Sequence, residues 1–307
     1  MIYEVTQVTT VNYAAVVPFA QHMLRMTPVD RPGQIVLETS MKIDPEPTRL
    51  LEQRDFFGNP STEVEIATAH NRLVVTSWAR VRVDPVTPPL AELSPAWEEV
   101  RDEAMASSGL DAHSPVHFIF PSRVVQPSPP IRDYAAESFP PGRSILAGAM
   151  DLTHRIHKDF DFSPGSTDVR TVPSEAFKQR GGVCQDFAHI MITGLRDLGL
   201  PAAYVSGCLR TYPPPGQARL VGADATHAWV SVWCGDAGWY GLDPTNAVAA
   251  GEDHIVLAVG RDYADVAPVT GIIVSSGDQR MHAGVDVVPM EVRPVAVEKR
   301  PAARPAR

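Results

Sequence analysis

The feature that most constrains this chain is a pair of glycines and a cysteine placed directly before a helical hydrophobic pattern. Gly181 and Gly182 permit a tight turn and a close approach of the backbone, and Cys184 follows them. Gly199 is a strong signal for the end of a helix. The apolar residues between them recur at the spacing of one helix face: Phe187, Met191, Leu195 and Leu198. The sequence therefore predicts an amphipathic helix over 184–198 that begins at Cys184.

A cysteine at the start of a helix is suited to chemistry. The positive end of the helix dipole favours the thiolate form of Cys184. The first-turn N–H groups have no partner within the helix, so they can donate to an oxyanion formed when the sulfur attacks a carbonyl. The helix alone leaves a second interpretation open, since a free cysteine is most often a small buried hydrophobic residue. Asp186 in the same turn suits helix stability but partly opposes a thiolate, so its role is open.

A nucleophilic cysteine needs a base and a group that orients the base, and one predicted hairpin offers both. His227 begins an apolar strand with Trp229 on the same face, and Asp243 ends the partner strand. A hairpin loop of about five residues places His227 opposite residue 245, which makes Asp243 its diagonal neighbour at about 7–8 Å between backbones. An aspartate on an imidazole fixes its tautomer and stabilises its charged form. We therefore predict a site built from Cys184, His227 and Asp243.

Three stretches of the first 90 residues alternate between apolar and polar side chains, which is typical of half-buried strands. They are residues 35–43, 63–68 and 73–83. The residues expected on the buried face of the first stretch are Ile35, Leu37, Met41 and Ile43. Residues 55–60 carry a turn signal between strands. The pattern predicts an antiparallel β-sandwich, which we interpret as a packing or substrate-gating module.

Prolines separate this region from the rest of the chain. A proline-rich linker is expected over 84–95, and long elements are not expected in the proline-dense stretch from 115 to 141. The elements expected around and after that stretch are a helix over 96–107, a helix capped by Ser144, the cysteine helix, a strand over 202–209, the hairpin, and last strands within 269–298. We therefore predict an α+β fold in four parts: a β-rich domain (1–90), a connection (91–143), a core (144–298) and a basic, disordered tail (299–307).

The composition narrows the partners and the compartment. The chain has 307 residues, and its formal net charge of −9 argues against a general nucleic-acid binder. Its apolar runs are too short to span a bilayer, and its first residues lack the basic start and apolar run of a signal peptide. Three cysteines are too few for a secreted disulfide framework. We expect a cytoplasmic protein that binds neither nucleic acid nor membrane, and the sequence indicates no oligomeric state.

A metal site is weakly indicated at best. His154 and His157 stand three residues apart on an expected helix, but no cysteine or carboxylate pair has matching ligand spacing. We interpret them as surface or satisfied histidines and expect no metal. Cys208, within a strand, and Cys234, beside the hairpin turn, are expected to be inert thiols.

Several strings resemble the transglutaminase-like superfamily of papain-like cysteine enzymes, and more closely its bacterial members with an N-terminal β-region. These strings span nearly the whole chain: residues 55–59, 182–189, 204–207, 227–229, 243–246 and 260–266. The resemblance implies Cys184 as nucleophile, His227 as general base and acid, and Asp243 as its orienter. It also implies a sheet packed on the cysteine helix and no cofactor. Gln185, next to the cysteine, and Trp229 are the candidate substrate-binding residues.

Two residues depart from the pattern of that superfamily. Cys208 stands where an aromatic residue is usual, and Ser231 stands where an acidic residue is often found. Both lie outside the three candidate catalytic residues, so they bear on the shape of the substrate more than on the chemistry.

The combined pattern predicts a cysteine-dependent hydrolase that cleaves amide or isopeptide bonds through a thioester, with a peptide or amide as substrate. Two alternatives stay open. An amine-accepting acyl transfer, as in a protein-glutamine transglutaminase, would use the same three residues. A non-catalytic binding protein on the same fold is disfavoured, because Cys184, His227 and Asp243 are all present.

Overall fold

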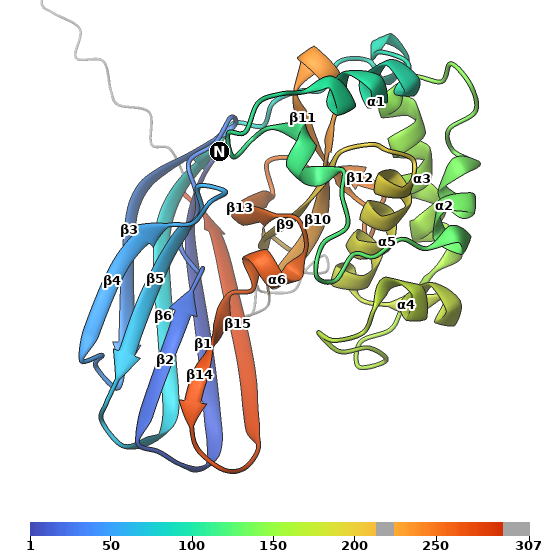
Figure 1. Ribbon diagram of the computed structural model, residues 1–307. Coiled ribbons are helices and arrows are strands. Elements are labelled where there is room, and N and C mark those ends of the chain that lie inside the picture. The colour runs from blue at the N-terminus through green and yellow to red at the C-terminus, as the bar shows by residue number, and fades with distance from the viewer. Residues whose placement is uncertain (213–223, 291–307) are drawn as a thin grey trace, which may run out of the picture.

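The alternating N-terminal sequence forms two four-stranded antiparallel sheets (Figure 1). The computed structural model describes residues 1–212 and 224–290. One sheet has the strand order β15 (Gln279–Pro289), β1 (Ile2–Val17), β6 (His70–Val83) and β3 (Gln34–Asp44). The other has the order β14 (Val269–Val274), β2 (Phe19–Leu24), β5 (Pro60–Ile66) and β4 (Arg49–Arg54). Apolar residues from both sheets meet in one core: Val11, Val17, Leu24, Val64, Ile66, Leu73 and Val75.

Strand β3 departs from the predicted alternation. Ile35 and Leu37, expected on the buried face, are 44% and 46% exposed. The pairing of β3 with β6 shifts register between Val36 and Glu38, and β3 lies at the edge of its sheet. Side chains on the two sides of such a bulge do not share a face, so a strict period of two cannot place them. The expectation for β6 is confirmed, because Leu73, Val75, Val81 and Val83 are buried on one face.

The second half of the chain builds a five-stranded antiparallel sheet covered by helices. The strand order is β12 (Val248–Ala249), β11 (Trp239–Asp243), β10 (Ala225–Trp233), β9 (Ala202–Leu209) and β13 (His254–Gly260). The helices are α1 (Trp97–Ala106), α2 (Pro129–Ala136), α3 (Ile145–Asp159), α4 (Pro173–Gln179), α5 (Cys184–Asp197) and α6 (Tyr263–Val266). A short parallel pair, β7 (Asp161–Phe162) and β8 (Gly181–Gly182), and 3₁₀ turns at Ala91–Leu93, Pro115–Phe118 and Gly235–Ala237 complete the elements.

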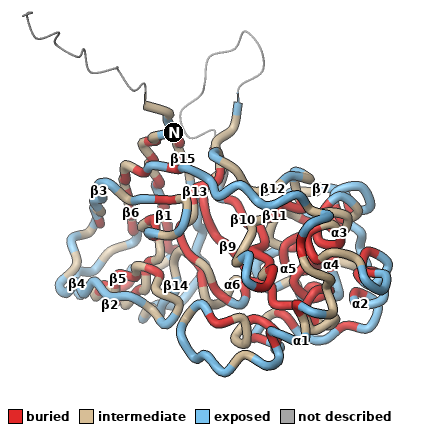
Figure 2. Tube along the Cα trace, turned by 90° about the horizontal axis from the view of Figure 1, so that it is seen from above, coloured by how far each residue is buried: buried red, intermediate tan, exposed pale blue. Residues whose placement is uncertain are grey.

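Helix α5 lies at the centre of this lobe. It contacts β9 and β10, and its apolar side chains share a core with Tyr204, Val230 and Val232. Figure 2 shows α5 and the strands beneath it as buried. The resulting α+β architecture, with antiparallel sheets at the N-terminus and a sheet packed on the cysteine helix, is the one that the sequence predicted.

The predicted helices and the hairpin are confirmed at close to their expected bounds. Helix α3 begins after Ser144, although the Ser144 side chain makes no capping hydrogen bond. Helix α2 begins at Pro129, because proline is tolerated in the first turn, where its missing N–H would have no partner. Trp233 pairs with Trp239, which leaves the five-residue loop expected for the hairpin.

The strands at the C-terminal end correct the predicted core of residues 144–298. Both strands expected within 269–298 exist, but β14 pairs with β2 and β15 pairs with β1. The chain thus returns from the helical lobe to complete both N-terminal sheets. The physical reason is that β1 and β2 would otherwise present unpaired edges. The predicted tail, 299–307, lies outside the described residues.

Two side-chain amides join the lobes at the outer edge of β13. Gln34 donates from Nε2 to the Val256 carbonyl and accepts the Val256 N–H at Oε1, both at 2.8 Å. Asn59 makes the same pair of hydrogen bonds with Val259, both at 2.8 Å. The backbone N–H and carbonyl groups of Val256 and Val259 at this edge are therefore hydrogen-bonded without a further strand. This gives the string 55–59, singled out in the sequence, a role in fixing the two lobes to each other.

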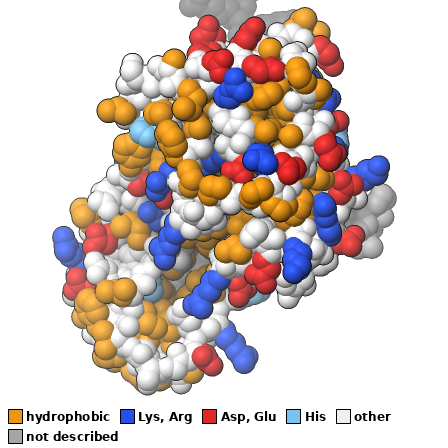
Figure 3. Space-filling view, turned by 45° about the vertical axis from the view of Figure 1, so that its right-hand side comes forward, with side chains coloured by type: hydrophobic (Ala, Val, Ile, Leu, Met, Phe, Trp, Pro, Cys, Tyr) orange, Lys and Arg blue, Asp and Glu red, His pale blue; other side chains and the backbone are white. Residues whose placement is uncertain are grey.

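No helix in the two described ranges combines the length and apolar character that a membrane span needs. On the face of the molecule in Figure 3, acidic and basic side chains are interspersed among apolar ones.

Candidate active site

Cys184 is the first residue of α5 and is partly exposed. The bend before it needs Gly182, since a Cβ there would lie 2.5 Å from Asp186 Oδ2. That oxygen accepts the Val183 N–H at 2.8 Å and the Thr167 hydroxyl at 2.6 Å. Burial raises the pKa of Asp186 above its ordinary value. Asp186 therefore closes the start of the helix that carries the thiol, which settles its open role in favour of structure.

His227 and Asp243 meet as the hairpin register predicted. The His227 Nε2 and the Asp243 Oδ2 are 2.7 Å apart, and both side chains are buried. The Cys184 thiol lies close enough to the imidazole to contribute to its raised pKa. The structure thus confirms the contact between His227 and Asp243, and the joint action of Cys184 with them stays a prediction. Because Asp243 holds Nε2, Nδ1 is the ring nitrogen left for the thiol.

Asp243 is fully buried and its carboxylate is surrounded by donors. Besides His227, its Oδ2 accepts from His254 Nε2 at 3.2 Å and from Asn246 Nδ2 at 2.7 Å. Its Oδ1 accepts the N–H groups of Thr245, at 2.9 Å, and of Asn246, at 3.2 Å. A buried carboxylate satisfied in this way is fixed in position and remains charged.

The proton of His254 can be assigned from its two partners. The Gly251 N–H donates to His254 Nδ1 at 3.2 Å, so Nδ1 is an acceptor. Nε2 then carries the proton and donates it to Asp243 Oδ2. His254 is therefore a neutral donor to the same carboxylate oxygen that contacts His227.

The pKa values of the pair are shifted in opposite directions. Burial alone would lower the pKa of His227, but the hydrogen bond to Asp243 and the nearby Cys184 sulfur outweigh burial and raise the pKa to about 9. Burial alone would raise the pKa of Asp243, but hydrogen bonds from His227, His254 and Asn246 hold it well below its ordinary range. The arrangement therefore supports a charged imidazolium next to a thiol at neutral pH.

Trp229 lies behind the two histidines. Its ring stacks on His227 with centroids 6.0 Å apart and meets the ring of His254 edge-on at 5.1 Å. The indole needs glycines on both neighbouring strands, since a Cβ on Gly207 or Gly241 would lie 2.5 Å or 3.2 Å from it. Trp229 is only 2% exposed, so its contacts are with the protein itself, and its substrate-binding role stays a prediction.

The other residues that the sequence analysis considered differ in how far they are exposed to solvent. Cys208 and Cys234 are buried, and burial raises the pKa of each thiol to about 12, as expected for inert cysteines. Gln185 is partly exposed beside Cys184, and its role as a substrate contact stays a prediction. His157 donates from Nδ1 to the Thr245 carbonyl, 2.8 Å away, so it is satisfied by the protein.

Within the described ranges, one group of side chains has the spacing of a metal site. Ligand atoms of His227, Asp243 and His254 all lie within 4.8 Å of one another. However, two ligands on one zinc ion at about 2.0–2.1 Å each would stand roughly 3.3 Å apart. The 2.7 Å between His227 Nε2 and Asp243 Oδ2 is a hydrogen-bond distance. We therefore interpret the group as a hydrogen-bonded network.

Sequence reasoning missed His254 and Asn246. Asn246 follows Asp243 by three residues within a string that was singled out, so the signal was present. His254 begins β13, which is separated from β11 in the sheet by β10 and β9. Its approach to Asp243 depends on how these strands curve, which no spacing in the sequence reveals.

The string 260–266, whose purpose the sequence did not explain, anchors the end of β13 to α5. The Tyr263 N–H donates to His189 Nε2 at 3.2 Å, and Arg196 donates to the Arg261 carbonyl at 2.6 Å. Both partners belong to the helix that begins with the thiol. The string thus fixes α5 relative to the sheet that carries His227.

Comparison with known proteins covers both lobes. Residues 3–82 match the bacterial transglutaminase-like N-terminal region, and residues 133–244 match the transglutaminase-like superfamily. An uncharacterized protein of Mycobacterium tuberculosis is 39% identical over 94% of this chain and 93% of its own length. A protein-glutamine gamma-glutamyltransferase of Pseudomonas aeruginosa is 35% identical over 35% of this chain and 16% of its own length.

The fold has a counterpart among solved structures. A proposed cysteine protease from Cytophaga hutchinsonii superimposes with a TM-score of 0.72 and 20% identity, over 96% of this chain and 93% of that one. Both lobes and their arrangement are therefore shared with a solved protein of low sequence identity. Together with the matches on each lobe, these likenesses show that the chain belongs to the transglutaminase-like superfamily, in the bacterial group that carries this N-terminal region.

Proposed function

We propose that this protein is a cysteine-dependent hydrolase that cleaves a peptide or amide bond through a thioester on Cys184. The observation that carries the proposal is His227, whose ring lies 2.7 Å from the Asp243 carboxylate and whose pKa is raised by both Asp243 and Cys184. A His227 with a pKa of about 9 is protonated at neutral pH, and an imidazolium beside the sulfur favours the thiolate.

In the proposed reaction, the Cys184 thiolate attacks the carbonyl carbon of the amide and forms a carbon–sulfur bond. The Cys184 N–H, in the first turn of α5, donates to the developing oxyanion together with one further donor that is not identified. His227 gives its proton to the leaving nitrogen as the carbon–nitrogen bond breaks, which leaves a thioester. Water then attacks the thioester and His227 takes a proton from it. The carbon–sulfur bond breaks, the acid is released, and the Cys184 thiolate and the His227 imidazolium are restored.

The role of Asp243 in this scheme is to position the ring and to stabilise its charge. It holds Nε2, so that Nδ1 faces the sulfur in both half-reactions. Its five donors keep it charged and immobile, so it does not itself take the proton.

The likeness in fold to the proposed cysteine protease supports hydrolysis. The partial match to a protein-glutamine gamma-glutamyltransferase favours the second candidate, acyl transfer to an amine. The two reactions share the first half and differ only in whether water or an amine attacks the thioester.

The nucleophile is tested by digesting a diverse peptide library with the wild type, Cys184→Ala and Cys234→Ala. We expect cleavage by the wild type and by Cys234→Ala, since Cys234 is buried and makes no contact with the site. Cleavage that persists in Cys184→Ala would contradict the assignment. A second experiment tests whether water or an amine attacks the thioester. The amides that the enzyme cleaves are incubated with it in the presence of a primary amine. Free acid alone supports hydrolysis, whereas a conjugate that grows with amine concentration supports transfer.

A further inference from the structure

The cleft between the two lobes contains a cavity of about 570 Å³ that the proposed reaction does not use. Its floor is the face of the core sheet that points away from α5, and its other walls come from the N-terminal lobe and from the segments that link the lobes. Residues along its walls are mostly apolar or aromatic: Val29, Val86, Val205, Val256, Val259, Phe57, Phe118, Trp229, Trp239 and Tyr240. The volume and lining are those of a site for a small molecule, which in proteins occupies about 300–1,000 Å³.

One cation faces this apolar cavity without a counter-charge. Arg31 lines it and forms no ion pair with any carboxylate in the described ranges. Burial lowers the pKa of Arg31 to about 10, and no neighbouring charge offsets the burial. The single carboxylate of the lining, Asp30, is exposed, and its Oδ1 accepts the Val36 N–H at 2.8 Å. Arg31 is partly exposed, and a guanidinium with no protein counter-charge can bind a carboxylate of a ligand through two parallel hydrogen bonds.

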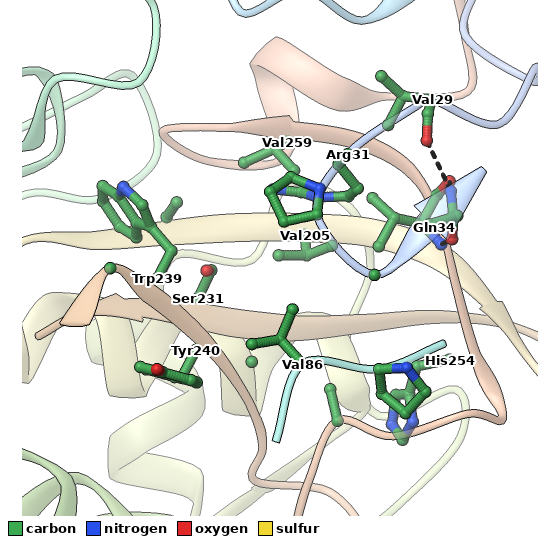
Figure 4. A pocket seen from close by; sticks show the side chains of 18 of the residues that line it. Val29, Arg31, Gln34, Val86, Val205, Ser231, Trp239, Tyr240, His254 and Val259 are labelled. Atoms are coloured by element: carbon green, nitrogen blue, oxygen red, sulfur yellow. Dashed lines mark hydrogen bonds between the residues drawn. The ribbon is translucent and has the colours of Figure 1, made fainter. Parts of the chain in front are cut away.

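The backbone at Arg31 is held in one geometry. The N–H and carbonyl of Arg31 pair with those of Gln34, at 3.0 Å and 2.9 Å. The intervening turn requires Gly33, whose φ is +84°. Gln34 is in turn bound to β13 through Val256. Figure 4 shows Arg31 and Gln34 on one side of the cavity, with Ser231, Trp239 and Tyr240 on the core side.

We propose that this cavity binds a small amphipathic carboxylate, with the acid on Arg31 and an aromatic or alkyl body against the apolar walls. Ser231, the residue that departs from the superfamily pattern, lines the same space and offers a hydroxyl to the ligand. Neither Cys184 nor His227 lines the cavity, but Trp229 and His254 do, so the cavity adjoins the network around Asp243. The proposed binding does not depend on the proposed hydrolysis.

The test compares 4-phenylbutanoate with its neutral analogue 4-phenylbutan-1-ol, by calorimetric titration of the full chain. We expect saturable binding of the acid to the wild type and an affinity at least about tenfold higher than for the alcohol, the effect of one charge-assisted hydrogen bond. This comparison needs no variant. Equal affinity for the two probes, or no saturable binding of the acid at millimolar concentration, would overturn the proposal.

Three variants then locate the binding. Arg31→Gln should lower the affinity for the acid about tenfold and leave the affinity for the alcohol unchanged. Ser231→Asp should also lower the affinity for the acid, because it adds a negative charge to the cavity. Arg72→Gln, an exposed arginine on β6, is the matched control for charge. Unchanged affinity in both Arg31→Gln and Ser231→Asp would show that the acid binds elsewhere and would overturn the site. Cys184→Ala should bind the acid as the wild type does, whatever the outcome for catalysis.

Discussion

Two buried histidines in the core lobe have pKa values that are shifted in opposite directions. His189, on α5, is 1% exposed, and burial lowers its pKa to about 4. His227, on β10, is 8% exposed, and its pKa is raised to about 9. Burial acts on both rings in the same direction. The difference is that His227 faces a carboxylate at 2.7 Å, whereas His189 accepts a backbone N–H at 3.2 Å.

The comparison shows that burial alone holds an imidazole neutral, and that a carboxylate partner reverses the direction of the pKa shift. A ring that accepts a backbone N–H is held neutral and ties two segments together. A ring between a carboxylate and a thiol is held charged and can move a proton. Substitutions that change one partner at a time therefore test the comparison.

The largest effect is expected from His227→Ala. Without the imidazolium, the Cys184 thiolate loses its counter-charge and the leaving group loses its proton donor. We expect turnover of any amide substrate to fall by a factor on the order of 10³ or more. Alkylation of Cys184 by iodoacetamide, which needs the thiolate, should slow by about tenfold or more near neutral pH.

The alkylation readout is specific because the other two thiols are buried with pKa values of about 12. His189→Gln is the matched control, since it replaces a buried histidine of the same lobe that has no contact with the thiol in the structure. An alkylation rate in His227→Ala equal to that of the wild type would contradict an imidazolium–thiolate pair.

The next effect is expected from Asp243→Asn. In the wild type, His227 stays protonated until the pH rises through about 9, so kcat/KM should fall on an alkaline limb near that pH, because the leaving nitrogen then loses its proton donor. An asparagine removes the charge that raises this pKa, so the limb should move to lower pH. We expect kcat/KM to fall by about 10²-fold or more at neutral pH. A limb that stays in place would show that Asp243 does not set the charge of His227.

How much of this site the sequence could predict depends on whether each contact is local. The distance between His227 and Asp243 follows from a single hairpin whose loop length is legible, so the pair could be predicted from alternation and turn residues alone. The position of Cys184 follows from two glycines and one helical stripe. These are features of neighbouring residues, and the structure places them as expected.

The contacts that the sequence did not reveal are between distant strands. β14 and β15 were predicted as strands but assigned to the wrong lobe, because any exposed edge could have received them. The predicted burial pattern of β3 was wrong next to a bulge, which a period of two cannot anticipate. His254 reaches Asp243 only because the sheet brings the start of β13 to the end of β11. In each case the missing information is which edges meet, and not which residues form an element.

A smaller effect is expected from His254→Phe, which removes one of five donors to Asp243 and keeps an aromatic ring against Trp229. The remaining donors keep Asp243 charged, but the carboxylate is less well fixed and its negative charge less stabilised. We expect kcat/KM to fall by about tenfold, with the alkaline limb moving less than in Asp243→Asn. His254→Gln, which can still donate to Asp243, should recover most of the loss. Equal pH profiles in the phenylalanine variant and the wild type would show that His254 has no positioning role.

The smallest effect is expected at His189, the neutral histidine of the pair, and it concerns the free energy of unfolding. The folded-state pKa of His189 is lowered to about 4 from an ordinary value of 6.5, so its stabilising contribution is fully present above pH 6.5 and is lost as the pH falls toward 4. Between about pH 7.5 and about pH 5.5 the wild type should lose about 1.4 kcal/mol of unfolding free energy from this residue. His189→Gln can still accept the Tyr263 N–H and does not titrate, so its loss over the same interval should be smaller by about that amount. Urea denaturation of both proteins at the two pH values measures the difference. If the two proteins lose equal stability, His189 is not held neutral by burial, and the contrast with His227 does not hold.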